Sequence, residues 1–183
     1  VNSTISDNST QGGDVDSGRG GGIYNITGTL SLHNSTISDN VASHGGGIYN
    51  SQDGVVLLRN SIVRGNISFK DDGNNCLGRI ESQGYNLLGN ARQCEFIAST
   101  GDRLNTPLPY FPMTGSPGYY PLPRATAAMD AGNPAGCLDH EGRLLTVDQR
   151  GVPRQGRCDI GSYEYNENHD PFFYLLLPAT VHP

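Results

Sequence analysis

Two short motifs recur along the first third of the chain and limit what it can fold into. The hexapeptide GGGIYN occurs at residues 20–25 and again at 45–50, and the heptapeptide NSTISDN occurs at 2–8 and 34–40. A weaker copy, NSIVRGN, occupies residues 60–66. Motifs that return at such intervals indicate a structure built from repeated units.

Aligning the motifs on their asparagines places apolar residues in columns, separated mostly by Ser, Thr, Asn or Asp. The columns are Ile5 with Ile37 and Val63, Leu30 with Val56, Leu32 with Leu58, and Ile23 with Ile48. Such alternation over short runs is typical of strands with one buried face. Because a unit of about 25 residues cannot bury that face alone, we expect successive units to stack, each strand pairing with its copy one unit later.

The stacked arrangement also explains the composition of the motifs. We expect the consecutive glycines where the chain bends, since no Cβ should project there and φ can be positive. Asparagine is the next residue to tolerate a left-handed turn, and stacked Asn side chains can hydrogen-bond along the stack. After the glycines, Ile should return to the core and Tyr should point outward.

These residues resemble a known group of proteins. GGGIYN and NSTISDN are similar to the repeats of right-handed parallel β-helix surface proteins, including the polymorphic outer-membrane protein repeats. Three later blocks resemble the C-terminal region of bacterial choice-of-anchor Q proteins: CLGRIESQGYNLLGN (76–90), ATAAMDAGNPAGC (125–137) and DQRGVPRQGRCDIGSYEY (148–165). The resemblance covers nearly the whole chain to Tyr165 and implies a secreted or surface-attached β-helix whose C-terminal end is irregular and disulfide-bonded.

We therefore expect an all-β fold, a right-handed parallel β-helix (β-solenoid) with an irregular disulfide-bonded C-terminal portion. Residues 1–90 should form the coils, 91–165 an irregular continuation of the β-helix, and 166–183 a polar linker followed by an apolar tail. Residues 101–124 depart from the family pattern, because they hold six of the eleven prolines of the chain.

Four cysteines allow three pairings. We expect Cys76–Cys94 and Cys137–Cys158, because neighbour pairing closes loops of about 20 residues that would each contribute about 3 kcal/mol in the chain-entropy model. The chain has no Cys-x-x-Cys spacing, which argues against a metal site. Disulfides predict an oxidising compartment, and hence an extracellular or cell-surface location.

Charge and length exclude several partner classes. The formal net charge is −6, and Lys70 is the only lysine. Without a basic cluster, neither nucleic acid nor an anionic membrane surface is an expected partner. No segment is long enough to span a membrane.

The candidates for chemistry are few. Asp14 and Asp16 in GGDVDSG are the best candidate calcium ligands, but a solvated loop explains them better, so we expect no cofactor. Asp71 and Asp72 beside Lys70 are typical of a surface turn. His33 and His44 flank the second repeat without a third ligand, which indicates exposed turn residues rather than a metal site.

Four carboxylates lie in the blocks that resemble the family: Asp130, Asp148, Asp159 and Glu164. General acid–base chemistry is one interpretation of them. For Asp130 and Asp159, a buried role in capping turns explains the pattern at least as well.

Near the C-terminus, six consecutive large apolar residues form a candidate assembly segment: Phe172, Phe173, Tyr174, Leu175, Leu176 and Leu177. In water such a run is an aggregation hazard. It should therefore pack on the flank of its own body or add as a strand to a neighbouring subunit. The first repeat begins at Val1 without a capping helix, and we expect another subunit or preceding coils to cover that end.

The function expected from these features is non-enzymatic. The chain should be an extracellular structural protein, a self-assembling subunit of a surface filament or sheath. It should form a homo-oligomer or polymer through head-to-tail stacking and an apolar C-terminal strand. The alternative is an adhesin or carbohydrate-binding module of a larger surface protein, with polysaccharide contact. A polysaccharide lyase is the third interpretation.

Overall fold

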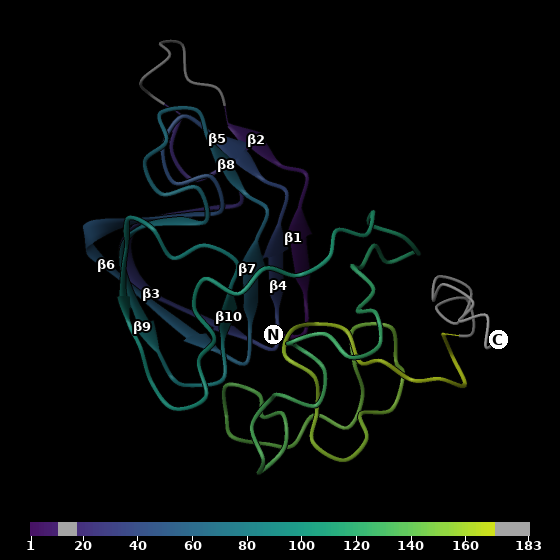
Figure 1. Ribbon diagram of the computed structural model, residues 1–183. Coiled ribbons are helices and arrows are strands. Elements are labelled where there is room, and N and C mark those ends of the chain that lie inside the picture. Colours follow the sequence, from purple (N-terminus) through teal and green to yellow (C-terminus); the bar gives the residue numbers. More distant parts are fainter. Residues whose placement is uncertain (11–17, 171–183) are drawn as a thin grey trace, which may run out of the picture.

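The computed structural model describes residues 1–10 and 18–170, and these residues form an all-β structure without helices (Figure 1). The strands are β1 (Thr4–Ser6), β2 (Ser9–Thr10), β3 (Ile23–His33), β4 (Thr36–Ser38), β5 (Val41–Ala42), β6 (Ile48–Arg59), β7 (Ile62–Arg64), β8 (Ile67–Ser68), β9 (Cys76–Ser82), β10 (Leu87–Leu88) and β11 (Cys94–Ile97). Consequently no helix among these residues could cross a membrane.

The strands form three parallel sheets. Their orders are β1-β4-β7-β10, β11-β9-β6-β3 and β2-β5-β8. Neighbours in a sheet come from successive repeats, so the chain visits each sheet once per repeat before returning to the first. We call this arrangement, residues 1–10 and 18–103, the stack.

The register within the sheets confirms the columns predicted from the sequence. Ile37 lies opposite Ile5 on one side and Val63 on the other, and Leu30 lies opposite Val56. Ile37, Val56 and Val63 are fully buried and belong to one apolar core inside the stack. Like side chains therefore lie over like, which is the expected result of pairing each strand with its copy.

The repeated glycines serve two separate needs at the bend. Gly45, the first of its triplet, has a φ of +59°, a conformation that favours glycine. Gly46 is not in the left-handed region, but a Cβ there would lie 2.3 Å from the carbonyl oxygen of Ile67 in the next repeat. The triplet thus combines a left-handed turn with close backbone contact between repeats.

Asparagine side chains form a ladder through the stack, as the sequence suggested. Asn8 Nδ2 donates to Asn40 Oδ1 at 2.9 Å, and Asn40 Nδ2 donates to Asn66 Oδ1 at 2.9 Å. Asn66 Nδ2 continues the ladder to Asn75 Oδ1 at 3.1 Å. Each oxygen also accepts the backbone N–H of the preceding asparagine, so the ladder satisfies buried backbone donors at the bend.

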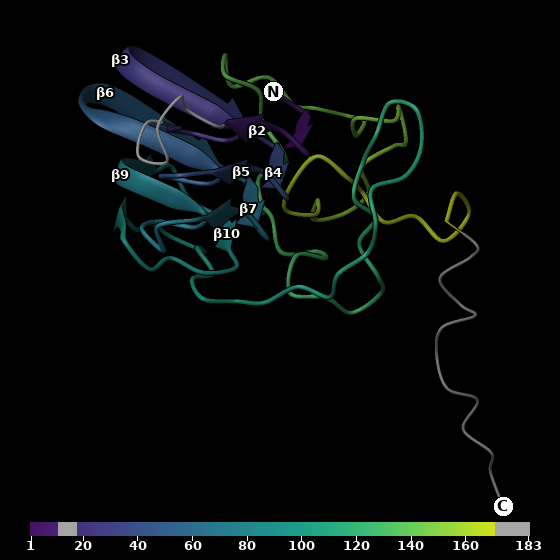
Figure 2. The same ribbon diagram turned by 90° about the horizontal axis from the view of Figure 1, so that it is seen from above.

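The outer face of the sheet β1-β4-β7-β10 is covered by residues 107–170, which we call the C-terminal portion. Ile62 and Leu87 turn outward from the strands and form a second apolar cluster with Ile160 and Tyr163. In Figure 2, β3, β6 and β9 lie above one another and the C-terminal portion lies beside them. One face of this sheet therefore packs on the core of the stack and the other on the C-terminal portion.

This lateral packing differs from the continuation expected for residues 91–165. Residues 94–103 do extend the stack, since β11 pairs with β9 and Arg103 bridges Leu87. The proline-rich segment that follows lacks long strands, because proline cannot donate to a ladder. It carries the chain back along the side of the stack.

Residues 166–170, expected as a linker, form a turn packed on the body. The Asp170 N–H donates to the Asn166 carbonyl at 2.8 Å, and both residues are buried. The turn is fixed by the ion pair between Arg150 Nη1 and Asp170 Oδ1 at 2.7 Å.

Candidate functional site

Two of the predicted sites lie outside the described residues. These are the candidate calcium ligands Asp14 and Asp16, and the apolar segment Phe172–Leu177. Within residues 1–10 and 18–170, no three His, Cys, Asp or Glu side chains gather as a metal site would require.

The two histidines are not the exposed turn residues that the sequence indicated. His33 closes β3 and is only 4% exposed, because residues near Leu138 cover it. Burial, reinforced by the nearby Arg59 charge, lowers the pKa of His33. His44 is half-buried and its Nδ1 contacts Asp72 Oδ2, while Ser68 donates to the other oxygen of Asp72 at 2.7 Å. The contacts among His44, Asp72 and Ser68 fix the bend at one corner of the stack.

Both cysteine pairs predicted from the sequence are present. Cys76–Cys94 joins β9 to β11 at the last repeat of the stack, and Cys137–Cys158 closes a loop in the C-terminal portion. No cysteine is free. The first disulfide therefore holds the far end of the stack, and the second holds the segment that lies along its side.

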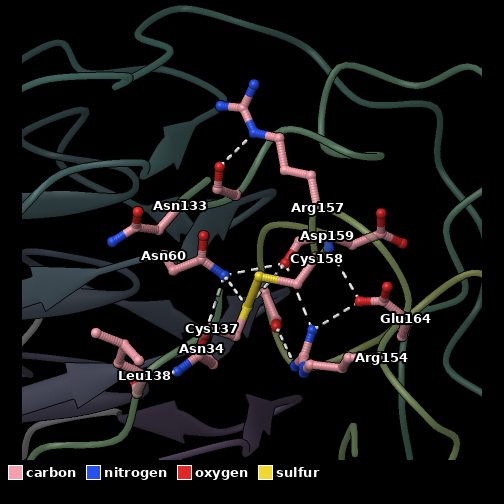
Figure 3. Close-up of a disulfide and its surroundings, with 12 residues drawn as sticks. Asn34, Asn60, Asn133, Cys137, Leu138, Arg154, Arg157, Cys158, Asp159 and Glu164 are labelled. Carbon is pink, nitrogen blue, oxygen red and sulfur yellow. Dashed lines mark hydrogen bonds and ion pairs between the residues drawn. A yellow bond between two sulfur atoms is a disulfide. The ribbon is translucent and has the colours of Figure 1, made fainter. Parts of the chain in front are cut away.

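The second disulfide lies where the C-terminal portion meets the asparagines of the stack (Figure 3). Asn60 Nδ2 contacts Asn34 Oδ1, Cys137 Sγ and the Asp159 carbonyl oxygen, each at 3.0 Å. Asn34 Nδ2 in turn donates to the Leu138 carbonyl at 2.7 Å. These two asparagines therefore dock the disulfide loop onto the stack.

Buried charges surround this junction. Arg154 Nη1 pairs with Glu164 Oε2 at 3.0 Å, and both side chains are only 3% exposed. Glu164 also accepts the backbone N–H groups of Asp159 and Gln155. Burial lowers the pKa of Arg154 and raises the pKa of Glu164.

Asp159 completes this cluster. Its two carboxylate oxygens accept the backbone N–H groups of Asp130 and Tyr165, both at 2.7 Å. Burial, with the neighbouring Glu164 charge second, raises the pKa of Asp159 to about 7. Asp159 thus caps turns as the sequence suggested, whereas Asp130 contributes its backbone and its side chain is exposed.

A second ionic group lies next to Tyr163. Asp148 Oδ2 pairs with Arg150 Nε at 2.9 Å, and the Asp148 oxygens also accept three backbone N–H groups. The Arg150 guanidinium lies 3.8 Å from the Tyr163 ring centroid and 4.8 Å from that of Tyr119. These buried carboxylates are occupied by backbone and arginine donors, so their geometry suits fixing loops rather than proton transfer to a ligand.

The first repeat presents strand edges that have no neighbouring strand among the described residues. β1, β2 and β3 each lie at the end of their sheet. The core-facing side chains Ile5, Ile23 and Leu30 are half-buried there, while Ile37, Ile48 and Val56 directly below them are fully buried. We call this surface the open end.

A hollow of about 520 Å³ lies at a corner of the stack between β6, β9 and β11. Tyr49, Gln52, Asp53, Leu77 and Glu95 contribute to its walls. Sequence reasoning missed it, although the unequal spacing between repeats carried the signal: YNSQDGVV (49–56) in the second repeat corresponds to the short LGRI (77–80) in the third.

Comparison with protein families, with curated proteins and with solved structures found no match for this chain. The resemblance to β-helix surface proteins therefore rests on the motifs themselves. Function has to be argued from the geometry described above.

Proposed function

We propose that the three sheets are the sides of a right-handed parallel β-helix, and that this chain is a non-enzymatic extracellular structural protein that assembles by stacking. Further coils would add to the open end, supplied by a second copy of the chain. A surface filament or sheath is the form that repeated head-to-tail contact produces.

The observation that carries this proposal is the open end. Three parallel sheets end there together, so that β1, β2 and β3 each have one edge without a partner strand among residues 1–10 and 18–170. A parallel edge is completed by a parallel strand, and only another coil offers three strands at matching positions. The half-buried Ile5, Ile23 and Leu30 would then become as buried as their counterparts below.

Two further features support the proposal. The disulfides are those of a protein that matures in an oxidising compartment, which favours an extracellular location. The carboxylates Asp148, Asp159 and Glu164 are occupied in turns, which favours a structural role over catalysis. The apolar segment 172–177 is proposed as an additional intersubunit strand.

Sedimentation velocity across a wide concentration range tests the proposal. We expect the full chain to form species larger than a monomer and the double variant Ile5→Lys/Leu30→Lys to remain monomeric, because charged side chains at the open end prevent a second coil from docking. The variant Val55→Lys, at an exposed apolar position of β6, which has a neighbouring strand on both sides, should assemble normally.

Deleting residues 171–183 separates the two contacts. A truncated chain that stays folded but assembles more weakly supports the proposed intersubunit strand. A full-length protein that is monomeric at all concentrations, or a lysine variant that assembles like the parent, would refute stacking at the open end.

A further inference from the structure

The corner hollow arises from a step in the register between repeats. Tyr49 lies opposite Leu77 and Val56 lies opposite Ile80, so six residues of β6 correspond to only two of β9. The four additional residues carry the corner of the second repeat outward, and β6 reaches further out than β9 in both views (Figures 1 and 2). The hollow lies beneath this overhang, against the third and fourth repeats.

The overhang has a defined structure. Asn50 Nδ2 donates to the Gly54 carbonyl at 2.9 Å within the overhang and to the Arg79 carbonyl at 2.8 Å in the repeat below. Gly78 allows the backbones of β9 and β6 to approach closely, because a Cβ there would lie 2.0 Å from the Asn50 carbonyl oxygen. The walls are therefore fixed by the fold and need not form when a ligand arrives.

The hollow combines an aromatic ring with hydrogen-bonding groups. Tyr49 makes an edge contact with Tyr24, ring centroids 5.3 Å apart, and the Arg19 guanidinium lies 5.2 Å from the Tyr49 ring centroid. These contacts hold the ring in place. Among the described residues, the side chains of Gln52, Asp53 and Glu95 form no hydrogen bond or ion pair, so one amide and two carboxylates are available to a ligand.

We propose that the corner hollow binds a neutral oligosaccharide. A sugar offers C–H faces that pack on Tyr49 and Leu77, and hydroxyl groups that donate to the carboxylates and exchange hydrogen bonds with Gln52. The volume of about 520 Å³ lies within the range of small-ligand sites. This site is independent of the open end, since it involves the second to fourth repeats.

The charges of the lining decide against an acidic polysaccharide. Asp53 and Glu95 contribute two negative charges to the hollow. Beyond Gln52, a smaller hollow of about 170 Å³ contains Arg79, but its guanidinium is paired with Glu81 at 2.8 Å. An anionic chain would meet repulsion there, because the described residues that line the hollow include two carboxylates and no Lys or Arg. An extended peptide is the competing class, because the overhang also has backbone groups without a partner strand in β9.

Isothermal titration calorimetry with cellohexaose, xylohexaose and maltohexaose tests the proposal on the full chain. We expect at least one of them to bind with a Kd below about 1 mM. Gln52→Ala/Asp53→Ala should weaken that binding at least tenfold without altering the circular dichroism spectrum, because neither side chain bonds to any of the described residues. Gln155→Ala/Glu141→Ala, a matched amide and carboxylate pair on the C-terminal portion, should bind like the parent.

Three results would overturn the proposal. These are the absence of binding by all three neutral oligosaccharides, equal binding by the two double variants, and stronger binding of an uncharged Gly-Ser-Thr peptide or of a galacturonate hexamer. The result is distinct from the assembly test, because the Ile5→Lys/Leu30→Lys variant should bind the oligosaccharide as the parent does.

Discussion

The stack and the C-terminal portion are two parts of one chain that are stabilised in different ways. In the stack, each residue meets its own counterpart: Ile37 contacts Ile5 and Val63, and Asn40 bonds Asn8 and Asn66. In the C-terminal portion, contacts are between unlike groups that occur once, such as Arg154 with Glu164.

Because of this difference, the two parts should respond differently to amino-acid substitutions. In a stack, one substitution disturbs the repeats on both sides but leaves the pattern of the others unchanged. In the C-terminal portion, removing one member of a buried ion pair leaves the other as an uncompensated charge. The first kind of stability is distributed along the chain, and the second is concentrated in a few residues.

The largest effect should come from charging the core of the stack. Ile37→Asp should prevent folding, because a carboxylate would be buried between Ile5 and Val63 without a partner. Ile37→Ala should lower the free energy of unfolding by about 2–5 kcal/mol. Urea denaturation followed by circular dichroism measures both.

The matched control is Ile67→Asp, on β8, where the side chain is 50% exposed. It should change the free energy of unfolding by less than about 1 kcal/mol. A soluble, normally folded Ile37→Asp protein would contradict the register, and with it the distinction between the two parts.

The next effect concerns the buried ion pair of the C-terminal portion. Glu164→Ala should lower the free energy of unfolding by about 3–5 kcal/mol, because Arg154 and two backbone N–H groups lose their acceptor. Hydrogen exchange should show faster exchange first at residues 148–165. Arg79→Met, which breaks the exposed pair with Glu81, should cost less than about 1 kcal/mol. Equal costs for the two variants would mean that burial does not distinguish these pairs.

The smallest effect is a pH dependence that belongs to Asp159. Because its pKa in the folded state is about 7, above its ordinary value of 3.8, the folded state binds the proton more tightly than the unfolded state does. The contribution of Asp159 to stability is therefore fully present below about pH 4 and is lost as the pH rises through about 7.

Carbon-detected NMR of the Asp159 carboxyl group should show a titration midpoint near pH 7. Denaturation of the parent and of Asp159→Asn at pH 4.5 and 7.5 measures how the free energy of unfolding depends on pH. Only the parent carries the titrating group at this position. A titration midpoint near pH 4, or an identical pH dependence of stability in the two proteins, would contradict this prediction.

The stack was largely predictable from sequence, and the reason is physical. Because each strand pairs with its copy in the next repeat, residues aligned in sequence become partners in the sheet. Aligning the asparagines was therefore enough to pair Leu30 with Val56 and Ile23 with Ile48. The local disulfides were also predictable, because short loops favour neighbouring cysteines.

The packing of the C-terminal portion could not be predicted in the same way. Nothing in its sequence repeats, and the contact of Ser162 with Thr36 joins residues 126 positions apart. The burial of His33 and the exposure of Asp130 depend on that packing, so both were assigned wrongly. The corner hollow was missed for another reason: alignment emphasises what repeats share, whereas the hollow comes from where they differ.

The asparagine ladder gives the stack a chemical direction. Along Asn8, Asn40 and Asn66 each amide donates to the amide oxygen of the next asparagine in the row, and Asn75 ends the series by donating to the Asn90 carbonyl at 2.9 Å. The second N–H of Asn40 and of Asn66 donates to the carbonyl of Ile5 and of Ile37 in the earlier repeat. The amide-to-amide bonds therefore all run in one direction and polarise one another. The two ends of the ladder differ, since the Asn8 oxygen accepts no bond from the described residues while the last donor is already used. An incoming coil can extend this row only by presenting a donor to Asn8, so growth at that end would be vectorial, with each added unit fixing the orientation of the next.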